Sequence, residues 1–494
     1  MLARMASSLS SRFLGGLERL AGRRGAAPGG PPGPPRIPLL GNKGGLIRFF
    51  RDPVGNLLRL HAAHGDVAAL SSGDPTLVCA FGMENNRRVL SDAEHFHNSA
   101  SMPFPVPKGS SPERLFNALM AMNGEQHRRH RRLMMPAFGK AAVAQHRDDM
   151  VATVERLVER IRPGDVVDVN AQMIELTMIA AMRCLFGVDL GSGAEELGRM
   201  SMAVAGGITD FRNLLFPHDL PGTPYARFMR LCERMERRVR ALILERRAAN
   251  DRPRDVLSIL IEAHDDDGVG LTDDELVGHV NVLFIAGHET TAFTLTWTLF
   301  LLAQHPRVYA DLEAELRSAL RGDAPTVESL SRLPLLDAVV RESMRLLPPT
   351  PFLFVRRGAS AFSLGPHALP AGAKVILSPI VTHRAASLYP EPKRFLPGRW
   401  DTISPGPYEY MPFGAGPRFC IGAAFGAQLV RIALAVLVQR FRFTLPPDAR
   451  IARKVQGITM GPRYGMPMRV ARHDGQLSPS SNVQGDIHEL VDLR

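Results

Sequence analysis

One of the four cysteines stands in a glycine-rich loop, Phe413-Gly414-Ala415-Gly416-Pro417-Arg418-Phe419-Cys420-Ile421-Gly422. A lone cysteine is most often a small buried hydrophobic residue. Here the glycines let the backbone approach a ligand closely, and the apolar helix that follows supplies N–H groups and a positive dipole that stabilise a thiolate. Arg418 suits an anionic group on the ligand. Because no other Cys or His lies nearby, the loop fits a single axial ligand to a macrocyclic iron better than a four-ligand zinc site.

A second candidate site interrupts a long apolar helix. Thr272 and Glu275 form a capping-box pattern, and the periodicity then runs to Gln304, before Pro306. The middle reads Ala286-Gly287-His288-Glu289-Thr290-Thr291, where a buried carboxylate is costly without water or a partner. A structural interpretation has Thr290 bonding back to the Ala286 carbonyl in a kinked helix. In the functional interpretation, Gly287 makes room for a flat ligand while Glu289 and Thr290 handle protons.

Taken together, these motifs resemble the cytochrome P450 family of heme-thiolate monooxygenases, over roughly residues 36–470. The family loop pattern Phe-x-x-Gly-x-Arg-x-Cys-x-Gly is filled at every fixed position, by Phe413, Gly416, Arg418, Cys420 and Gly422. The resemblance implies heme b with Cys420 as the axial thiolate, contacts from Phe413, Arg418 and Gly422, and Ala286 and Gly287 beside the heme. It also implies that Glu289 and Thr290 relay protons.

Two further segments follow the same family in order. Glu342-Ser343-Met344-Arg345 is similar to the family's Glu-x-x-Arg motif, and Arg399 stands in the later Pro-x-Arg-aromatic segment. By itself the first pair could be a surface i,i+3 ion pair worth a few tenths of a kcal/mol. The resemblance implies instead that Glu342, Arg345 and Arg399 are structural and hold the cysteine loop.

The propionates of a heme need cationic partners. His127 and Arg131 are four apart and share one helical face, so both can reach one side of the cofactor. Many members of the family have Trp where His127 stands. Arg356 resembles a third propionate ligand, although the adjacent Arg357 leaves that register open.

The surrounding sequence predicts a mainly helical α+β protein. We expect a single large helical domain of the P450 type with small β-sheets, at residues 36–471, between a basic leader with a Pro/Gly-rich spacer (1–35) and a flexible tail (472–494). The predicted elements follow from hydrophobic periodicity. Helices are expected near 123–139, 140–161, 170–187, 224–250, 272–304, 306–320, 334–347 and 420–440; strands are expected near 67–79, 352–358, 373–380 and 464–470.

Composition narrows the class of protein. The 494 residues are 45% hydrophobic and 22% charged with a net charge of +11, which excludes general disorder. Cys79, Cys184, Cys232 and Cys420 are too scattered for a disulfide framework. The excess of arginine could attract nucleic acid, a membrane surface or an acidic protein. Because aromatic platforms and nucleic-acid motifs are missing, we expect no nucleic acid.

The function implied by the resemblance is insertion of one oxygen atom from O₂ into a lipophilic small molecule. A terpenoid, steroid, fatty acid or polyketide would suit the apolar residues expected around the pocket. Too few residues follow the cysteine helix for a flavin domain, so we expect a separate electron donor such as ferredoxin with its reductase. The alternatives are a peroxide-driven peroxygenase and a heme-binding sensor or carrier without turnover.

The first 24 residues carry five arginines against one acid, with Leu2, Met5, Leu9 and Phe13 at helical spacing. The segment has no apolar run long enough to span a membrane. It predicts either a helix on an anionic membrane surface, an organelle-targeting peptide or a plain basic leader. We therefore expect a cytoplasmic protein with peripheral membrane contact through this segment, and organelle targeting as the alternative.

Overall fold

The computed structural model describes residues 30–37, 40–99, 102, 104–188, 194–208, 210–249, 255–472 and 482–493. These divide into two compact units, each assembled from distant stretches of sequence. Unit 1 comprises Met1–Ser99, Pro351–Pro392 and Pro405–Phe419, and unit 2 comprises Ala100–Thr350, Lys393–Ser404 and Cys420–Arg494. The predicted basic leader falls almost wholly on residues 1–29, outside the described residues.

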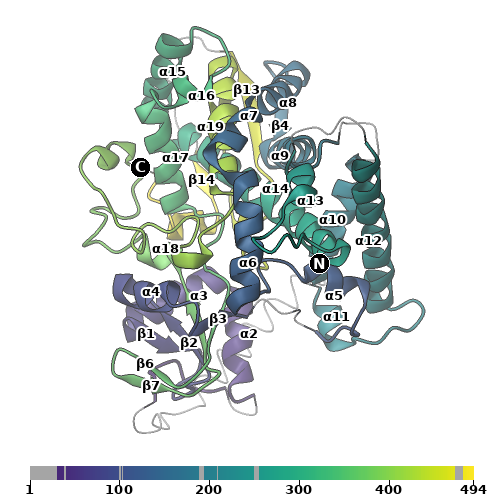
Figure 1. Cartoon of the computed structure of the whole chain (residues 1–494). Helices are drawn as coiled ribbons and strands as arrows, with labels where there is room; N and C mark the ends of the chain where they lie inside the picture. The colour runs from purple at the N-terminus through teal and green to yellow at the C-terminus, as the bar shows by residue number, and fades with distance from the viewer. Residues whose placement is uncertain are drawn as a thin grey trace. The chain divides into compact units, whose positions relative to one another are not determined.

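Unit 1 is built on a mixed five-stranded sheet (Figure 1). Its strands, in spatial order, are β1 (Val67–Ala69), β2 (Leu77–Ala80), β8 (Lys374–Leu377), β5 (Arg356–Gly358) and β3 (Phe96–Asn98). Its other elements are α2 (Lys43–Arg51), α3 (Pro53–His64), α4 (Gly82–Ser91), α18 (Pro379–Thr382) and the hairpin of β6 (Phe362–Leu364) and β7 (His367–Leu369). The register pairs Asn98 with Arg356, which brings a candidate heme ligand beside an amide side chain.

The described part of the Pro/Gly-rich spacer is hydrogen-bonded to the β1–β2 region of unit 1. The amide of Ala69 donates to the Pro32 carbonyl at 2.7 Å, and that of Ser72 donates to the Pro34 carbonyl at 2.8 Å. A Cβ on Gly33 would lie 2.4 Å from the Ala69 carbonyl oxygen. Proline lacks an N–H but keeps its carbonyl, so the segment can accept hydrogen bonds from the β1–β2 turn. The packed part of unit 1 thus begins by Pro31, rather than at residue 36.

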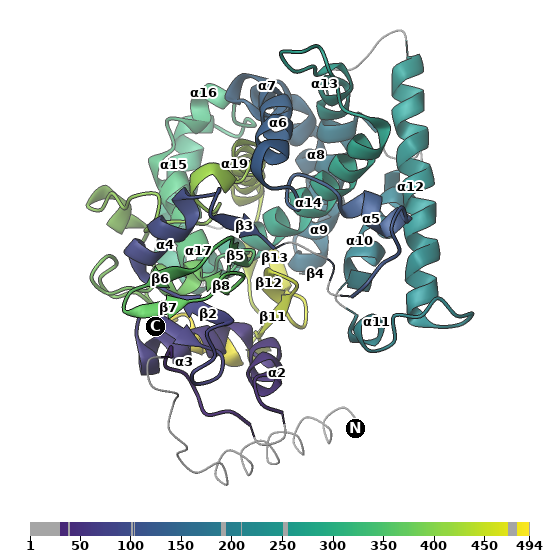
Figure 2. The same cartoon turned by 60° about the horizontal axis from the view of Figure 1, so that its bottom comes forward.

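Unit 2 is mainly helical and surrounds the 32-residue helix α14 (Asp273–Gln304). α14 packs against α5 (Ser111–Phe116), α9 (Val169–Phe186), α12 (Pro224–Ala248), α17 (Pro334–Leu346) and α19 (Ala423–Arg440). Figure 2 shows α10 and α12 side by side at one edge of this bundle. The unit's other helices are α6 (Gly124–Met134), α7 (Lys140–Gln145), α8 (Arg147–Arg160), α10 (Ala194–Ile208), α11 (Phe211–Leu215), α13 (Val256–Glu262), α15 (Pro306–Leu320) and α16 (Val327–Leu330).

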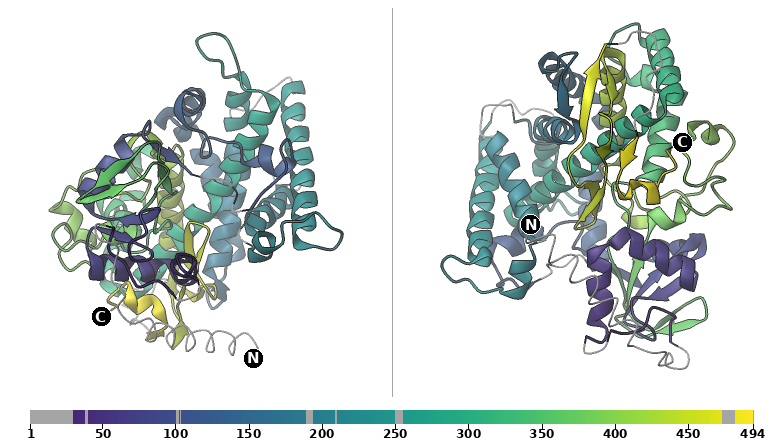
Figure 3. Two further views of the ribbon diagram at one scale, coloured as in Figure 1. Left: turned by 90° about the horizontal axis from the view of Figure 1, so that it is seen from below. Right: turned by 180° about the vertical axis from the view of Figure 1, so that it is seen from behind.

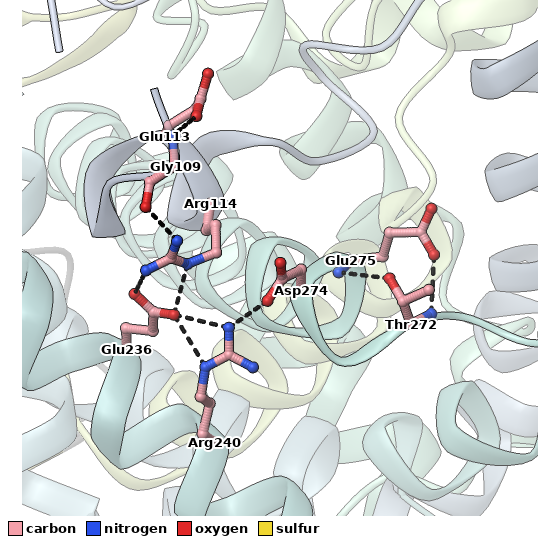
Figure 4. A network of polar contacts seen from close by, with 8 residues as sticks. All are labelled: Gly109, Glu113, Arg114, Glu236, Arg240, Thr272, Asp274 and Glu275. Carbon is pink, nitrogen blue, oxygen red and sulfur yellow. Dashed lines mark hydrogen bonds and ion pairs between the residues drawn. The ribbon is translucent and has the colours of Figure 1, made fainter. Parts of the chain in front are cut away.

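The start of α14 confirms the capping box, since the Thr272 hydroxyl accepts from the Glu275 amide while the Glu275 carboxylate accepts from the Thr272 amide (Figure 4). Close to this end, Arg114 of α5 binds Glu236 of α12 at 2.7 and 2.9 Å. Glu236 also accepts from Arg240, which in turn binds Asp274. This charge network ties three helices together.

The strands of unit 2 come mostly from the C-terminal part of the chain, drawn in yellow in Figure 3. β13 (Pro467–Ala471) lies between β4 (Val166–Asp168) and β9 (Arg442–Thr444), and β11 (Arg453–Gln456) pairs with β12 (Thr459–Pro462) in a hairpin. β14 (Val483–Gln484) pairs with β10 (Ala449–Arg450), and Leu490 and Val491 are fully buried. The prediction of a flexible tail is therefore wrong for residues 482–493, whose few apolar side chains are packed.

The predicted fold class, mainly α with small β-sheets, is confirmed. One described helix, α19, is apolar and long enough to cross a membrane, but 61% of that stretch is buried inside the protein, as in an ordinary core helix.

Candidate heme-binding site

The cysteine loop depends on a glycine packed against α4. Gly416 has φ +68°, and a Cβ there would lie 2.2 Å from the Leu90 carbonyl oxygen. A larger residue would have to displace the backbone of α4, so this position requires glycine. Phe413 of the same loop packs its ring against Phe419, with centroids 6.2 Å apart.

Cys420 differs from the other three cysteines in its exposure. Cys79, Cys184 and Cys232 are buried, whereas the Cys420 side chain is exposed just before α19. Desolvation by the surrounding protein raises the pKa of the Cys420 thiol, and the Gly422 amide and the Arg131 charge act in the opposite direction. A thiol that is accessible and has a cation close by is suited to act as a metal ligand in its thiolate form.

α6 carries the cations of unit 2 that were predicted for the site. Arg131 is half-buried, and burial lowers the pKa of its guanidinium while Cys420 raises it. His127, one turn earlier on the same helix, is 4% exposed. The structure therefore places Arg131 within electrostatic reach of the cysteine.

Unit 1 contributes a second group of cations. Arg356 is buried in β5 and donates to the Asn98 side chain, whereas Arg357 is exposed. The alternation follows from the pleat of the strand, which turns successive side chains to opposite faces. Burial, together with repulsion from Arg418, lowers the pKa of Arg356 to about 10. Two guanidinium groups this close create a local positive potential that an anionic ligand group would relieve.

The polar segment of α14 interrupts its burial. Leu276–Phe284 and Thr291–Gln304 are buried, but Ala286 is exposed and Glu289 and Thr290 are half-buried. The Thr290 hydroxyl donates to the Ala286 carbonyl at 2.9 Å, as the structural interpretation expected. Its oxygen retains lone pairs and can still accept a hydrogen bond.

His288 of this motif points away from the exposed side. It is buried, and its Nδ1 lies 2.8 Å from the Phe284 carbonyl oxygen. Burial lowers the pKa of His288, so its ring is neutral at pH 7. We therefore assign it a packing role within the helix.

The sequence did not indicate the partner of Glu289. The Thr459 hydroxyl, from the β11–β12 hairpin, donates to Glu289 Oε2 at 2.8 Å. The two residues are 170 positions apart, and no spacing rule connects a threonine in a hairpin with a carboxylate in a distant helix.

Glu342, Arg345 and Arg399 form a buried ion-pair cluster. Glu342 and Arg345 are fully buried, and both arginines bind the Glu342 carboxylate at 2.9 Å. The Trp400 indole N–H also donates to Glu342, at 3.2 Å. This geometry differs from an exposed i,i+3 pair, because removing one partner would leave an uncompensated buried charge.

Another group of ligating side chains, His146, Asp149 and Cys184, lies within α7–α9 of unit 2. Asp149 is bound by Arg183 at 3.0 Å, and burial is the main factor that raises the pKa of the Cys184 thiol. The guanidinium opposes a metal cation, so the cluster is better explained as a packed ion pair beside a protonated thiol.

Each unit, considered by itself, carries side chains of the types that suit a heme. Unit 2 provides an accessible thiol with a nearby cation, and a helix with two adjacent small residues, Ala286 and Gly287, where its burial is interrupted. Unit 1 provides the cationic pair Arg356 and Arg418, which suits acidic side groups.

Comparison with known proteins identifies the family. The model of the cytochrome P450 family matches residues 31–466, so the chain belongs to the cytochrome P450 family. Cyclooctatin synthase of Streptomyces melanosporofaciens is 33% identical over 458 residues, which cover 90% of this chain and 95% of that protein. Pentalenene oxygenase of Streptomyces avermitilis is 29% identical over 462 residues, which cover 92% of this chain and 98% of that protein. Cyclooctat-9-en-7-ol 5-monooxygenase of Streptomyces melanosporofaciens is 31% identical over 436 residues, which cover 86% of this chain and 91% of that protein.

Solved structures agree with this assignment. A retinoic acid-bound cyanobacterial member of the family has a TM-score of 0.77 at 24% identity and covers 90% of this chain and 99% of that one. The heme domain of cytochrome P450DA has a TM-score of 0.78 at 25% identity, and the match covers 90% of this chain and 97% of that one. The predicted P450-type fold is confirmed, and the chain is a cytochrome P450 monooxygenase, a class of enzyme that uses a heme-thiolate cofactor.

Proposed function

We propose that Cys420 is the axial thiolate ligand of the heme in this protein. The observation that carries the proposal is that, of the four cysteines, Cys420 alone combines exposure with a neighbouring guanidinium, that of Arg131. When bound, the heme supplies the oxidising chemistry, and the thiolate donates electron density that favours O–O cleavage.

The remaining predicted residues fall into three roles. His127, Arg131, Arg356 and Arg418 bind the propionates, while Phe413, Gly422, Ala286 and Gly287 shape the heme contacts. Glu342, Arg345 and Arg399 are structural, since their buried ion pairs fix α17 to the segment around Trp400.

Glu289 and Thr290 deliver protons. Glu289 is half-buried on α14, so its carboxylate can exchange protons with solvent and turn toward the exposed side of the helix. Thr290 gives its own proton to the Ala286 carbonyl, which leaves its oxygen free to accept a hydrogen bond from water or a ligand.

The substrate is a lipophilic small molecule, and within that class we propose a terpenoid. Two relatives that cover most of this chain are named for pentalenene and cyclooctat-9-en-7-ol. Phe104, Leu119 and Met460 are buried apolar side chains of unit 2, a type of residue that suits a lipophilic ligand. The Phe104 ring packs against Tyr225 and Phe228 of α12 and so belongs to an aromatic cluster.

The electrons come from a separate redox protein, such as a ferredoxin with its reductase, drawn to the basic surface by charge complementarity. Cytoplasmic location with peripheral membrane contact through the leader is part of the same proposal, and it concerns residues outside those the structure describes.

The test is turnover of the purified, heme-loaded protein with pentalenene as the probe. With ferredoxin, its reductase and NADPH we expect a product containing one added oxygen atom from ¹⁸O₂. NADPH without the redox proteins should give none. Equal product yield from hydrogen peroxide alone would favour a peroxygenase. Absence of any oxygenated product from pentalenene and a panel of other terpenoids would overturn the substrate proposal.

A further inference from the structure

The β11–β12 hairpin is fixed along one face of the central helix. Three α14 residues at four-residue spacing, Glu289, Phe293 and Trp297, contact β12. The Trp297 indole N–H donates to the Met460 carbonyl at 3.0 Å, and a Cβ on Gly461 would lie 2.4 Å from the Phe293 ring. The hairpin can therefore hold a polar group on α14 in a defined place.

That polar group is the carboxylate of Glu289. Within the described part of the chain, no arginine, lysine or histidine forms an ion pair with this carboxylate. The Thr459 hydroxyl donates a hydrogen bond to it at 2.8 Å. Thr459 is 8% exposed, so water does not compete freely for its hydroxyl. A hydrogen bond to a carboxylate in such surroundings fixes the direction in which that carboxylate points.

Thr459 has a second acceptor within reach. Its Oγ1 lies 3.0 Å from the Gln456 carbonyl oxygen of the same hairpin. One hydroxyl has one proton, so it can donate to Glu289 or to Gln456 at any moment. Rotation of the hydroxyl group about the Cβ–Oγ1 bond thus decides whether the carboxylate is held.

We propose that Thr459 is a positioning residue for Glu289, which holds the carboxylate through Oε2 and releases it by turning to the Gln456 carbonyl. The inference rests on the proposed proton-delivery role of Glu289. Held, the carboxylate has a fixed orientation; released, it can swing and pass a proton on.

The test observes the hydrogen bond on Glu289 directly. Infrared spectra of the heme-loaded protein, taken as differences from Glu289→Gln, isolate the carboxylate stretching bands of this one group, whose frequencies change when a hydrogen bond is lost. Thr459→Val removes the donor with little change in shape, and we expect these bands to shift. Thr459→Ser keeps a hydroxyl and should restore the wild-type bands.

The matched control is Thr298→Val, which removes a fully buried hydroxyl that donates to the Thr294 carbonyl elsewhere on α14. It should leave the carboxylate bands of Glu289 unchanged. Thr459→Ala provides a second variant if the valine does not fold. Unchanged carboxylate bands in the valine or alanine variant would overturn the proposal.

A kinetic measurement separates this inference from the function on which it rests. With redox proteins and NADPH, the fraction of oxygen released as hydrogen peroxide should rise in Thr459→Val and return to the wild-type value in Thr459→Ser. If Glu289→Gln leaves peroxide release and turnover unaltered, the proton-delivery role itself is wrong. If Glu289→Gln alters them while Thr459→Val matches the wild type, only the role of Thr459 is wrong.

Discussion

Two adjacent arginines in β5 show how one residue position decides a role. The sequence favoured Arg356 over Arg357 but left the register open, and the strand pairing shows that the two differ in burial. Arg356 pairs with Asn98 across the sheet, is buried and lies close to Arg418, whereas Arg357 is exposed. Only Arg356 combines burial with a neighbouring positive charge that an anion would relieve.

Replacing Arg356 by leucine should therefore weaken heme retention. The loss of a charge-assisted hydrogen bond to a propionate should speed heme release by about ten- to a hundredfold. Transfer of heme to excess apomyoglobin measures this rate. Arg357→Leu is the control on the same strand and should release heme at the wild-type rate. Equal rates for the two variants would show that Arg356 does not bind the heme.

At the scale of elements, the charge network around Glu236 holds α5 in place. Hydrogen bonds from Arg114, Ser111 and Arg240 overcome the opposing effect of burial and lower the pKa of Glu236 to about 2. Asn281 of α14 also donates to the Leu115 carbonyl at 2.9 Å, and a Cβ on Gly278 would lie 2.3 Å from the Asn117 carbonyl oxygen. The charge network secures the side of α5 that faces α12 (Figure 4).

Glu236→Gln should loosen this helix. We expect faster amide hydrogen exchange over residues 111–117 and a loss of about 2 kcal/mol of stability, because the two arginines remain partly exposed and can be rehydrated. The exposed Glu233 on the same helix is the control, and Glu233→Gln should change neither quantity. Unchanged exchange in Glu236→Gln would contradict the role of the network.

The same carboxylate gives a pH dependence with a defined sign. The pKa of Glu236 is depressed in the folded state relative to its ordinary value of 4.5. Its contribution to the free energy of unfolding is therefore fully present above pH 4.5 and is lost as the pH falls toward 2. Urea unfolding across this range should show a weaker pH dependence in Glu236→Gln than in the wild type.

The long helices could be predicted because their signals are local. Thr272 caps α14, Pro306 follows its end, and the periodicity between them is regular. The shorter elements depend on distant partners. β14 forms by pairing with β10, and Thr459 meets Glu289 only after the hairpin has packed on α14. The motif residues could likewise be predicted from their residue types and their order in the sequence. The residues that contact them lie far away in the sequence and become neighbours only in the folded protein.

At the scale of the whole molecule, buried neutral histidines set a limit on acid stability. His130 Nδ1 lies 2.8 Å from His279 Nε2, and His130 Nε2 lies 3.2 Å from Glu275. Burial, and then repulsion from His130, lowers the pKa of His279 to about 3. Burial also lowers the pKa values of His130, His146, His288 and His305.

Because the unfolded chain binds these protons more readily, stability is full above pH 6.5 and falls as the pH drops below that value. For His279, keeping the ring neutral lowers the stability by about 2 kcal/mol between pH 7 and pH 5. Urea unfolding at the two pH values should show a smaller difference for His279→Asn than for the wild type. The exposed His264 serves as the control, and His264→Asn should behave like the wild type. A wild-type pH difference in His279→Asn would show that His279 is not the group responsible.

The central claim is that Cys420 binds the heme iron as a thiolate, and the absorption spectrum of the reduced, CO-bound protein tests it most directly. We predict the long-wavelength Soret band of thiolate ligation in the wild type and in Cys184→Ser, and its loss in Cys420→Ser. A wild-type Soret band at the short wavelength of histidine ligation, or a thiolate band that survives in Cys420→Ser, would contradict the assignment.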